Sequence, residues 1–245
     1  MSEKSVTNKK GKKHIWVSIL VICLILPILL AVSRYFGNRK YYLCSVLLIV
    51  LSMVPFLLSF EQRKPQAREI VTLAVMCAIA VASRAAFIMV PHFKPLVGIV
   101  MITGMAFGPE AGFLTGAISG FVSNFIFGQG PWTPWQMFAY GTGGFLAGLL
   151  AKAGIINGEK KLPAAIFGGV TVLCIVGPIL DVCTLFTMSS AITKESAAAI
   201  FLSGLPVNAI HALATFLTLF LLSRPITEKL DRIKIKYGMM EEDEL

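Results

Sequence analysis

The chain has 245 residues, of which 56% are hydrophobic and only 14% are charged. A typical soluble domain has about 25% charged residues, so this composition excludes an ordinary soluble globule, and it equally excludes a disordered chain. The net charge of +9 does not indicate nucleic-acid binding, because the Lys and Arg residues gather between apolar blocks and at the termini. The apolar blocks have the length that a bilayer requires, which predicts an all-α integral membrane protein.

Eight apolar segments predict transmembrane helices. They cover residues 15–33, 41–60, 70–90, 96–107, 111–127, 136–151, 162–188 and 197–223. A turn at 108–110 separates the fourth from the fifth, and the breaker-rich segment 128–135 predicts a loop before the sixth. A basic tail precedes the first segment and a polar tail follows the last. Cleavage of the first segment as a signal peptide is the alternative.

The distribution of Lys and Arg predicts the orientation of these spans. With the N-terminus in the cytoplasm, sixteen of the 22 Lys and Arg residues lie in cytoplasmic segments and five lie outside. Cytoplasmic loops of membrane proteins carry this excess of positive charge. We therefore expect both termini in the cytoplasm and an even number of spans. The segment 34–40, with three positive charges on the outside, runs against this arrangement.

Two helices carry small residues at intervals of four, which places them on one helix face. The third span has Ala74, Ala78, Ala82 and Ala86, and the fifth has glycines at 108, 112, 116 and 120. Other helices can approach such faces closely inside a membrane. Internal packing is the expected role of the glycines, whereas the alanine ridge (Ala74, Ala78, Ala82 and Ala86) could equally meet a partner protein.

Ionisable and amide side chains inside the spans are candidates for function, because burying them in a membrane is costly. Arg84 and Asp181 lie at similar depth, so they could either form an ion pair or line a polar cavity that opens outward. Asn208 and His211 share one face of the last span, and Asn124 lies near the outer end of the fifth. Hydrogen bonding between helices is the alternative role for these three residues.

The segment 128–136 is the most distinctive part of the sequence. Its glycines and prolines predict a rigid loop that fixes Trp132 and Trp135 in place. Together with Gln129, Gln136 and Tyr140, these tryptophans would form a wall for a flat ligand with polar edges. The other short outer loop, 91–95, would add Phe93. Tryptophans that simply mark the membrane interface are the alternative.

No motif for ATP hydrolysis, zinc proteolysis or serine hydrolysis is present, so we expect neither an enzyme nor a bound cofactor or metal. Any uphill transport would therefore need a partner that supplies energy. The five cysteines, Cys23, Cys44, Cys77, Cys174 and Cys183, lie in apolar runs without metal-ligand spacing. We expect them to be buried apolar residues.

The stretch 68–232 resembles the substrate-binding (S) component of an energy-coupling-factor (ECF) vitamin transporter. The resemblance rests on the alanine repeat from Ala74 to Ala82, on Gly108-Pro109-Glu110-Ala111-Gly112-Phe113, and on the run from Phe127 to Gln136 that leads into Gly143–Gly148. It implies a six-helix membrane domain that binds a vitamin at its outer side. It also implies that this domain docks through Ala74, Ala78 and Ala82 onto a shared membrane scaffold, which joins two cytoplasmic ATPases. These subunits are thought to topple in the bilayer with their ligand.

The resemblance divides the chain into residues 1–14, a basic tail; 15–67, two additional helices; 68–232, the six-helix core; and 233–245, a polar tail. The loop Gly-Pro-Trp-Thr-Pro-Trp-Gln most resembles a subgroup associated with cobalamin or related corrinoids, and riboflavin or another vitamin is the alternative. A bacterial plasma-membrane location follows. A stand-alone secondary transporter and a membrane enzyme are the alternatives of other classes, but neither a repeated half nor an acid or histidine cluster supports them.

Overall fold

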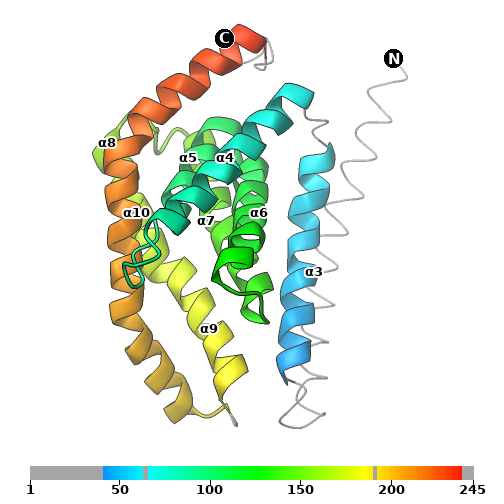
Figure 1. Cartoon of the computed structure of the whole chain (residues 1–245), viewed down its shortest axis with the longest axis vertical. Helices are drawn as coiled ribbons and strands as arrows, with labels where there is room; N and C mark the ends of the chain where they lie inside the picture. Colours follow the sequence, from blue (N-terminus) through cyan, green and yellow to red (C-terminus); the bar gives the residue numbers. More distant parts are fainter. Residues whose placement is uncertain (1–40, 63–65, 190–191, 239–245) are drawn as a thin grey trace.

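The computed structural model describes residues 41–62, 66–189 and 192–238, so the first expected span at 15–33 lies outside it. Its elements are α3 (Tyr41–Gln62), α4 (Ala67–Ala86), α5 (Leu96–Phe107), α6 (Pro109–Phe127), α7 (Trp132–Lys152), α8 (Lys161–Thr171), the π-helix η2 (Val172–Val176), α9 (Gly177–Met188) and α10 (Lys194–Tyr237). Because α8, η2 and α9 are continuous, these residues form seven helical rods and no strand (Figure 1). The all-α class is confirmed for this part of the chain, whereas eight membrane spans stay a prediction.

Three of the described helices are long and apolar enough to cross a membrane by length and composition. They are α4, the continuous helix 161–188, and α10. Helices α6 and α7 have 19 and 21 residues, but their glycine, serine and threonine content makes them less apolar. Helix α5, with 12 residues, is short for a span.

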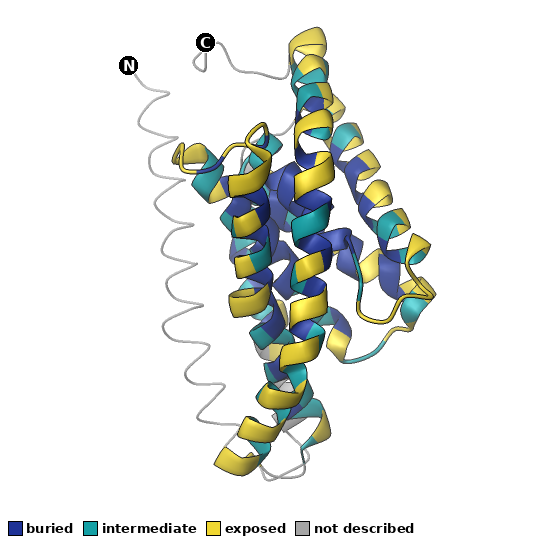
Figure 2. Ribbon diagram, turned by 90° about the vertical axis from the view of Figure 1, so that its left-hand side faces the viewer, coloured by how far each residue is buried: buried dark blue, intermediate teal, exposed yellow. Residues whose placement is uncertain are grey.

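Helix α5 forms the centre of the bundle. Every residue from Leu96 to Gly104 is buried, and its neighbours are α4, α6, α7 and α10. A helix that is apolar on all sides belongs in such a position. The surrounding helices turn their buried faces toward it and leave their outer faces exposed (Figure 2).

The glycine-rich faces of α5, α6 and α7 pack backbone against backbone. A Cβ atom added at Gly104 would overlap the carbonyl group of Gly144, and one at Gly148 would lie 2.5 Å from the nitrogen of Pro109. Glycine is therefore required at these positions for the helices to approach so closely. The expected internal role of the glycines is confirmed.

Several helix boundaries differ from those expected. Helix α7 begins at Trp132, so the segment 132–135 is its first turn and the loop is only 128–131. Proline is tolerated in the first turn of a helix, where the missing N–H group has no acceptor anyway. Helix α4 ends at Ala86 rather than Val90. Helix α10 continues past Ser223 to Tyr237, so the polar tail expected from residue 233 begins within a helix.

The π-helix η2 interrupts the long seventh rod just before Pro178. The N–H group of Gly177 bonds to the carbonyl of Val172, five residues earlier. Proline lacks an N–H group and its ring crowds the carbonyl of the preceding turn. One widened turn before Pro178 relieves this steric clash.

Helix α3 packs on α6, α7 and α9. Phe56 stacks on Phe113 with ring centroids 4.1 Å apart and meets Phe145 edge-on at 5.0 Å. Ile49 packs with Trp135 and Cys183. Helix α3 thus covers one side of the core and leaves the outer face of α4 uncovered (Figure 1).

The two ends of the bundle differ. We call the end that carries Lys152, Lys160, Lys161 and the last turns of α10 the basic end. The opposite end, with the turns at 128–131 and around Ser189, is the loop end. At the basic end, Arg68 donates a hydrogen bond to the carbonyl of Tyr237 at 2.9 Å, and Lys234 lies 5.1 Å from the ring centre of Phe107.

Candidate functional site

A network of polar side chains connects α4, α6 and α7 inside the bundle. Arg84 Nη1 donates to Ser123 Oγ and, at 2.8 Å, to Asn124 Oδ1. Asn124 Nδ2 in turn donates to Thr133 Oγ1 at 3.0 Å and to Gln136 Oε1 at 2.9 Å. Four of these residues are buried, and Gln136 is partly buried. We call these five residues the polar network.

Aromatic rings surround the guanidinium group of Arg84. Its Cζ atom lies 4.3 Å from the ring centre of Phe127 and 6.0 Å from that of Tyr140. The ring of Tyr140 meets His211 edge-on at 6.4 Å. Tyr140 and His211 therefore adjoin the polar network from α7 and α10.

Asp181 belongs to a separate pair. Asn208 Nδ2 donates to Asp181 Oδ2 at 2.8 Å, which ties α9 to α10. Gly204 makes room for this carboxylate, since a Cβ atom there would overlap it. The considered ion pair between Arg84 and Asp181 is not present in the described structure, because the two side chains turn to different neighbours.

The two tryptophans do not form one wall. Trp135 is buried against Phe186, with ring centroids 6.0 Å apart, and faces the cluster with Ile49 and Cys183. Trp132 is 43% exposed, and its indole N–H group donates to the carbonyl of Gly128 at 3.3 Å. Residues three apart share a helix face, but Trp132 is the first residue of α7 and its ring turns back to the loop 128–131, whereas Trp135 packs inward against Phe186.

Gln129 is exposed, but its side chain is held by hydrogen bonds within the loop. Its side chain donates to the carbonyl of Phe121 at 3.0 Å and accepts from Thr133 Oγ1 at 2.9 Å. These bonds close the turn 128–131 onto α6 and the start of α7. Gln129 thus supports Thr133, which belongs to the polar network.

The turn 87–95 lies beside α10 and brings further basic groups to the site (Figure 1). Lys94 Nζ donates to the carbonyls of Phe87 and Val90 and lies 5.3 Å from the ring centre of Phe127. Burial, and then the positive charge of Arg84, lower the pKa of Lys94. Phe93 stacks on Phe87 at 5.0 Å and so fixes the turn.

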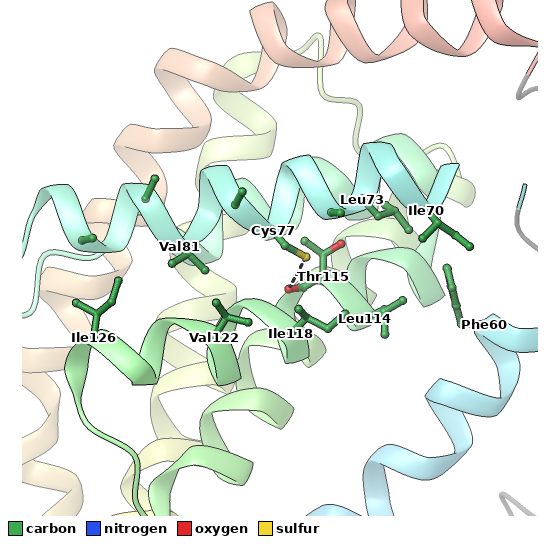
Figure 3. Close-up of a pocket in the computed structure, with 14 residues that line it drawn as sticks. Phe60, Ile70, Leu73, Cys77, Val81, Leu114, Thr115, Ile118, Val122 and Ile126 are labelled. Atoms are coloured by element: carbon green, nitrogen blue, oxygen red, sulfur yellow. Dashed lines mark hydrogen bonds between the residues drawn. The ribbon is translucent and has the colours of Figure 1, made fainter. Parts of the chain in front are cut away.

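The alanine ridge lies on an exposed face and not within the bundle. Ala74, Ala78, Ala82 and Ala86 are all exposed. The first three line an apolar groove of about 680 Å³ between α4 and α6, with Leu114, Ile118, Val122 and Ile126 on its other wall (Figure 3). Phe60, at the end of α3, lies at one end of this groove.

Sequence reasoning missed two members of the polar network, Ser123 and Thr133. Ser123 directly precedes Asn124, and Thr133 lies between the two tryptophans, so both stood within segments already singled out. Small hydroxyl residues are common in membrane helices, where they usually bond to their own backbone. Only their contacts with Arg84 and Asn124 distinguish them.

The described residues contain no group of His, Cys, Asp or Glu that could hold a metal ion. Among the cysteines in this part of the chain, Cys77 and Cys183 are buried, as expected, and Cys174 is exposed. Cys23 lies outside the described residues, and the side chain of Cys44 is not described.

Comparison with known proteins identifies the family. Searches among curated proteins and among solved structures gave no match. The family model described as "ECF-type riboflavin transporter, S component" matches residues 64–228, which is well over half of the chain. Members of this family are membrane-embedded substrate-binding subunits of transporters and not enzymes. The chain therefore belongs to the S-component family of ECF-type riboflavin transporters.

Proposed function

We propose that this subunit captures a vitamin from outside a bacterial cell and passes it to an ATP-driven importer. The observation that carries the proposal is the polar network around Arg84, set among apolar helices and flanked by Tyr140 and His211. Polar groups at such depth are costly unless they serve binding or packing. A few converging polar groups within an apolar enclosure are typical of a small-molecule site.

A flavin, either riboflavin or its phosphate, is the first candidate ligand and a corrinoid the second. The family is named for riboflavin, whereas the loop 128–136 resembles the corrinoid subgroup. The glycine-rich helix faces pack against one another and Trp135 is buried, so neither offers a surface to a large, flat corrin. A smaller fused ring with polar edges and a hydroxylated tail suits the amide and hydroxyl groups near Arg84.

The ligand can be identified on the purified subunit produced in cells supplied with a vitamin mixture. Its visible absorbance is measured, and extracted small molecules are identified by mass. A stoichiometric flavin is expected, and a corrinoid would reverse the order of the two candidates. A subunit that is empty and binds no vitamin in titration would contradict the proposed function. Uptake by the subunit without partner ATPases would favour a secondary transporter.

The alanine ridge is the proposed docking surface for the membrane scaffold that joins two ATPases. Its methyl groups leave a shallow, apolar and exposed face on which another helix can pack closely. Ala78→Leu should weaken assembly with the scaffold and leave vitamin binding unchanged. Val170→Leu, an exposed apolar position on α8, is the matched control. Lost binding with intact assembly would mean that the two faces are assigned wrongly.

The proposed arrangement in the membrane has eight spans with both termini in the cytoplasm. The gathering of Lys152, Lys160 and Lys161 with the C-terminal turns of α10 at the basic end supports a cytoplasmic position for that end. Reporter fusions after residues 156 and 238 should both give a cytoplasmic signal. A fusion after residue 130 should give an outside signal, and the reverse pattern would refute this orientation.

A further inference from the structure

Two side chains that carry a positive charge lie together beside the polar network, Arg84 on α4 and Lys94 in the turn 87–95. Both lie close to one aromatic ring, since Arg84 Cζ is 4.3 Å and Lys94 Nζ is 5.3 Å from the ring centre of Phe127. The imidazole of His211, on α10, adjoins them through Tyr140, whose ring lies 6.0 Å from Arg84 Cζ and 6.4 Å from the His211 ring. We call Arg84 and Lys94 the basic cluster.

The basic cluster has no acidic partner in the described part of the chain. Arg84 donates only to the neutral groups of Ser123 and Asn124, and Lys94 donates only to backbone carbonyls. The carboxylate of Asp181 accepts a hydrogen bond from Asn208 and is not paired with either residue of the cluster. Positive charge is therefore concentrated here without compensation by the protein.

Arg84 shows most clearly that this positive charge lacks a negatively charged partner. Its side chain is 7% exposed, both of its hydrogen bonds use Nη1, and its Nε atom is buried without a partner. A buried charge is costly unless it is paired, and the rings of Phe127 and Tyr140 offset only part of that cost. A guanidinium group is best matched by a planar or tetrahedral oxyanion, which accepts two parallel N–H bonds.

We propose that the basic cluster binds an oxyanion carried by the vitamin, a carboxylate or a phosphate monoester. This inference rests on the proposed function and narrows its ligand class. Among flavins, it selects the phosphorylated form over neutral riboflavin. Among other vitamins, it selects those with a free carboxylate. Arg84 and Lys94 contact the oxyanion, while the amides of the polar network meet the rest of the ligand.

Matched pairs of ligands test this inference on the purified full-length subunit. The pairs are flavin mononucleotide with riboflavin, biotin with biotin amide, and pantothenate with pantothenol. In at least one pair the anionic member should bind at least tenfold more tightly than the neutral one. The flavin pair reports on a phosphate, and the other two report on a carboxylate.

Variants test whether the preference for the anionic ligand comes from the basic cluster. Arg84→Gln should remove the preference for the anion, and Arg84→Lys should keep part of it. Because a buried substitution can disturb folding, Lys94→Gln in the surface turn provides a second test with a smaller loss of anion affinity. Lys152→Gln, an exposed cation at the basic end, is the control and should change neither affinity.

The outcomes separate this inference from the function on which it rests. If riboflavin or another neutral vitamin binds as tightly as its anionic partner, and Arg84→Gln does not alter that ratio, the oxyanion site is refuted while vitamin capture stands. If the subunit binds none of the six compounds and retains no vitamin from cells, vitamin capture itself fails, and the oxyanion site fails with it.

Discussion

The close packing of α5, α6 and α7 makes a quantitative prediction for Gly144→Ala. The new Cβ atom would lie 2.7 Å from Val100 Cγ1 and 2.6 Å from the carbonyl carbon of Gly112. The carbonyl oxygen of Gly112 would lie closer still, and bringing it to an ordinary contact of 3.4 Å requires the backbone of α6 to retreat by about 1 Å, since backbone cannot rotate away as a side chain can. Overpacking of this kind costs about 1–3 kcal/mol of unfolding free energy.

Gly169→Ala is the matched control for this experiment. Its added Cβ atom would meet its nearest neighbour, the carbonyl oxygen of Ala212, at 3.7 Å, which is ordinary contact. Both variants gain the same helix propensity from alanine, about 1 kcal/mol, so that gain cancels in the comparison. Thermal unfolding of the purified subunits should give a lower Tm for Gly144→Ala than for Gly169→Ala. Equal Tm values would refute the view that the glycine faces are needed for close packing.

Three further predictions follow from single contacts. Phe56→Leu keeps an apolar side chain but loses the stacking of α3 on α6, so thermal unfolding should report a loss of about 0.5–1.5 kcal/mol; an unchanged Tm would mean that the rings contribute no more than their burial. Asn208→Ala leaves the Asp181 carboxylate without its hydrogen-bond donor and should cost about 1–3 kcal/mol in the same assay, whereas Ser203→Ala, exposed on the same helix, should be neutral. Trp132→Ala should lower vitamin affinity in titration, and unchanged affinity would assign this exposed ring to the membrane interface.

Much of the helical framework could be predicted from the sequence, because the apolar blocks and the breakers between them are local signals. The segment 96–107 was predicted to the residue, and the glycine repeat on α6 indicated the close packing that its neighbours confirm. The start of α7 differs from the expected one because Pro131 and Pro134 are also typical of loops. The same residues fit the first turn of a helix, so their spacing does not distinguish the two structures.

The arrangement of side chains within the site was harder to predict. Arg84 and Asp181 have similar depth along their helices, but depth says nothing about the direction in which a side chain points. That direction depends on neighbours distant in sequence. Gly204 leaves room for the Asp181 carboxylate, and Ser123 accepts a hydrogen bond from the Arg84 guanidinium group. Trp135 likewise faces inward because α3, which lies outside the matched stretch 64–228, provides a surface for it.

Helix α10 is a continuous element of 44 residues with proline at positions 206 and 225. At about 1.5 Å per residue, His211 beside the basic cluster lies about 39 Å along the helix from Tyr237 at the other end. Because α10 curves over this length (Figure 1), a tilt of about 10° around the site would displace the far end by at most about 7 Å. Helix α10 can therefore act as a lever, and the contacts of Tyr237 with Arg68 and of Lys234 with Phe107 are those that such a movement would break first.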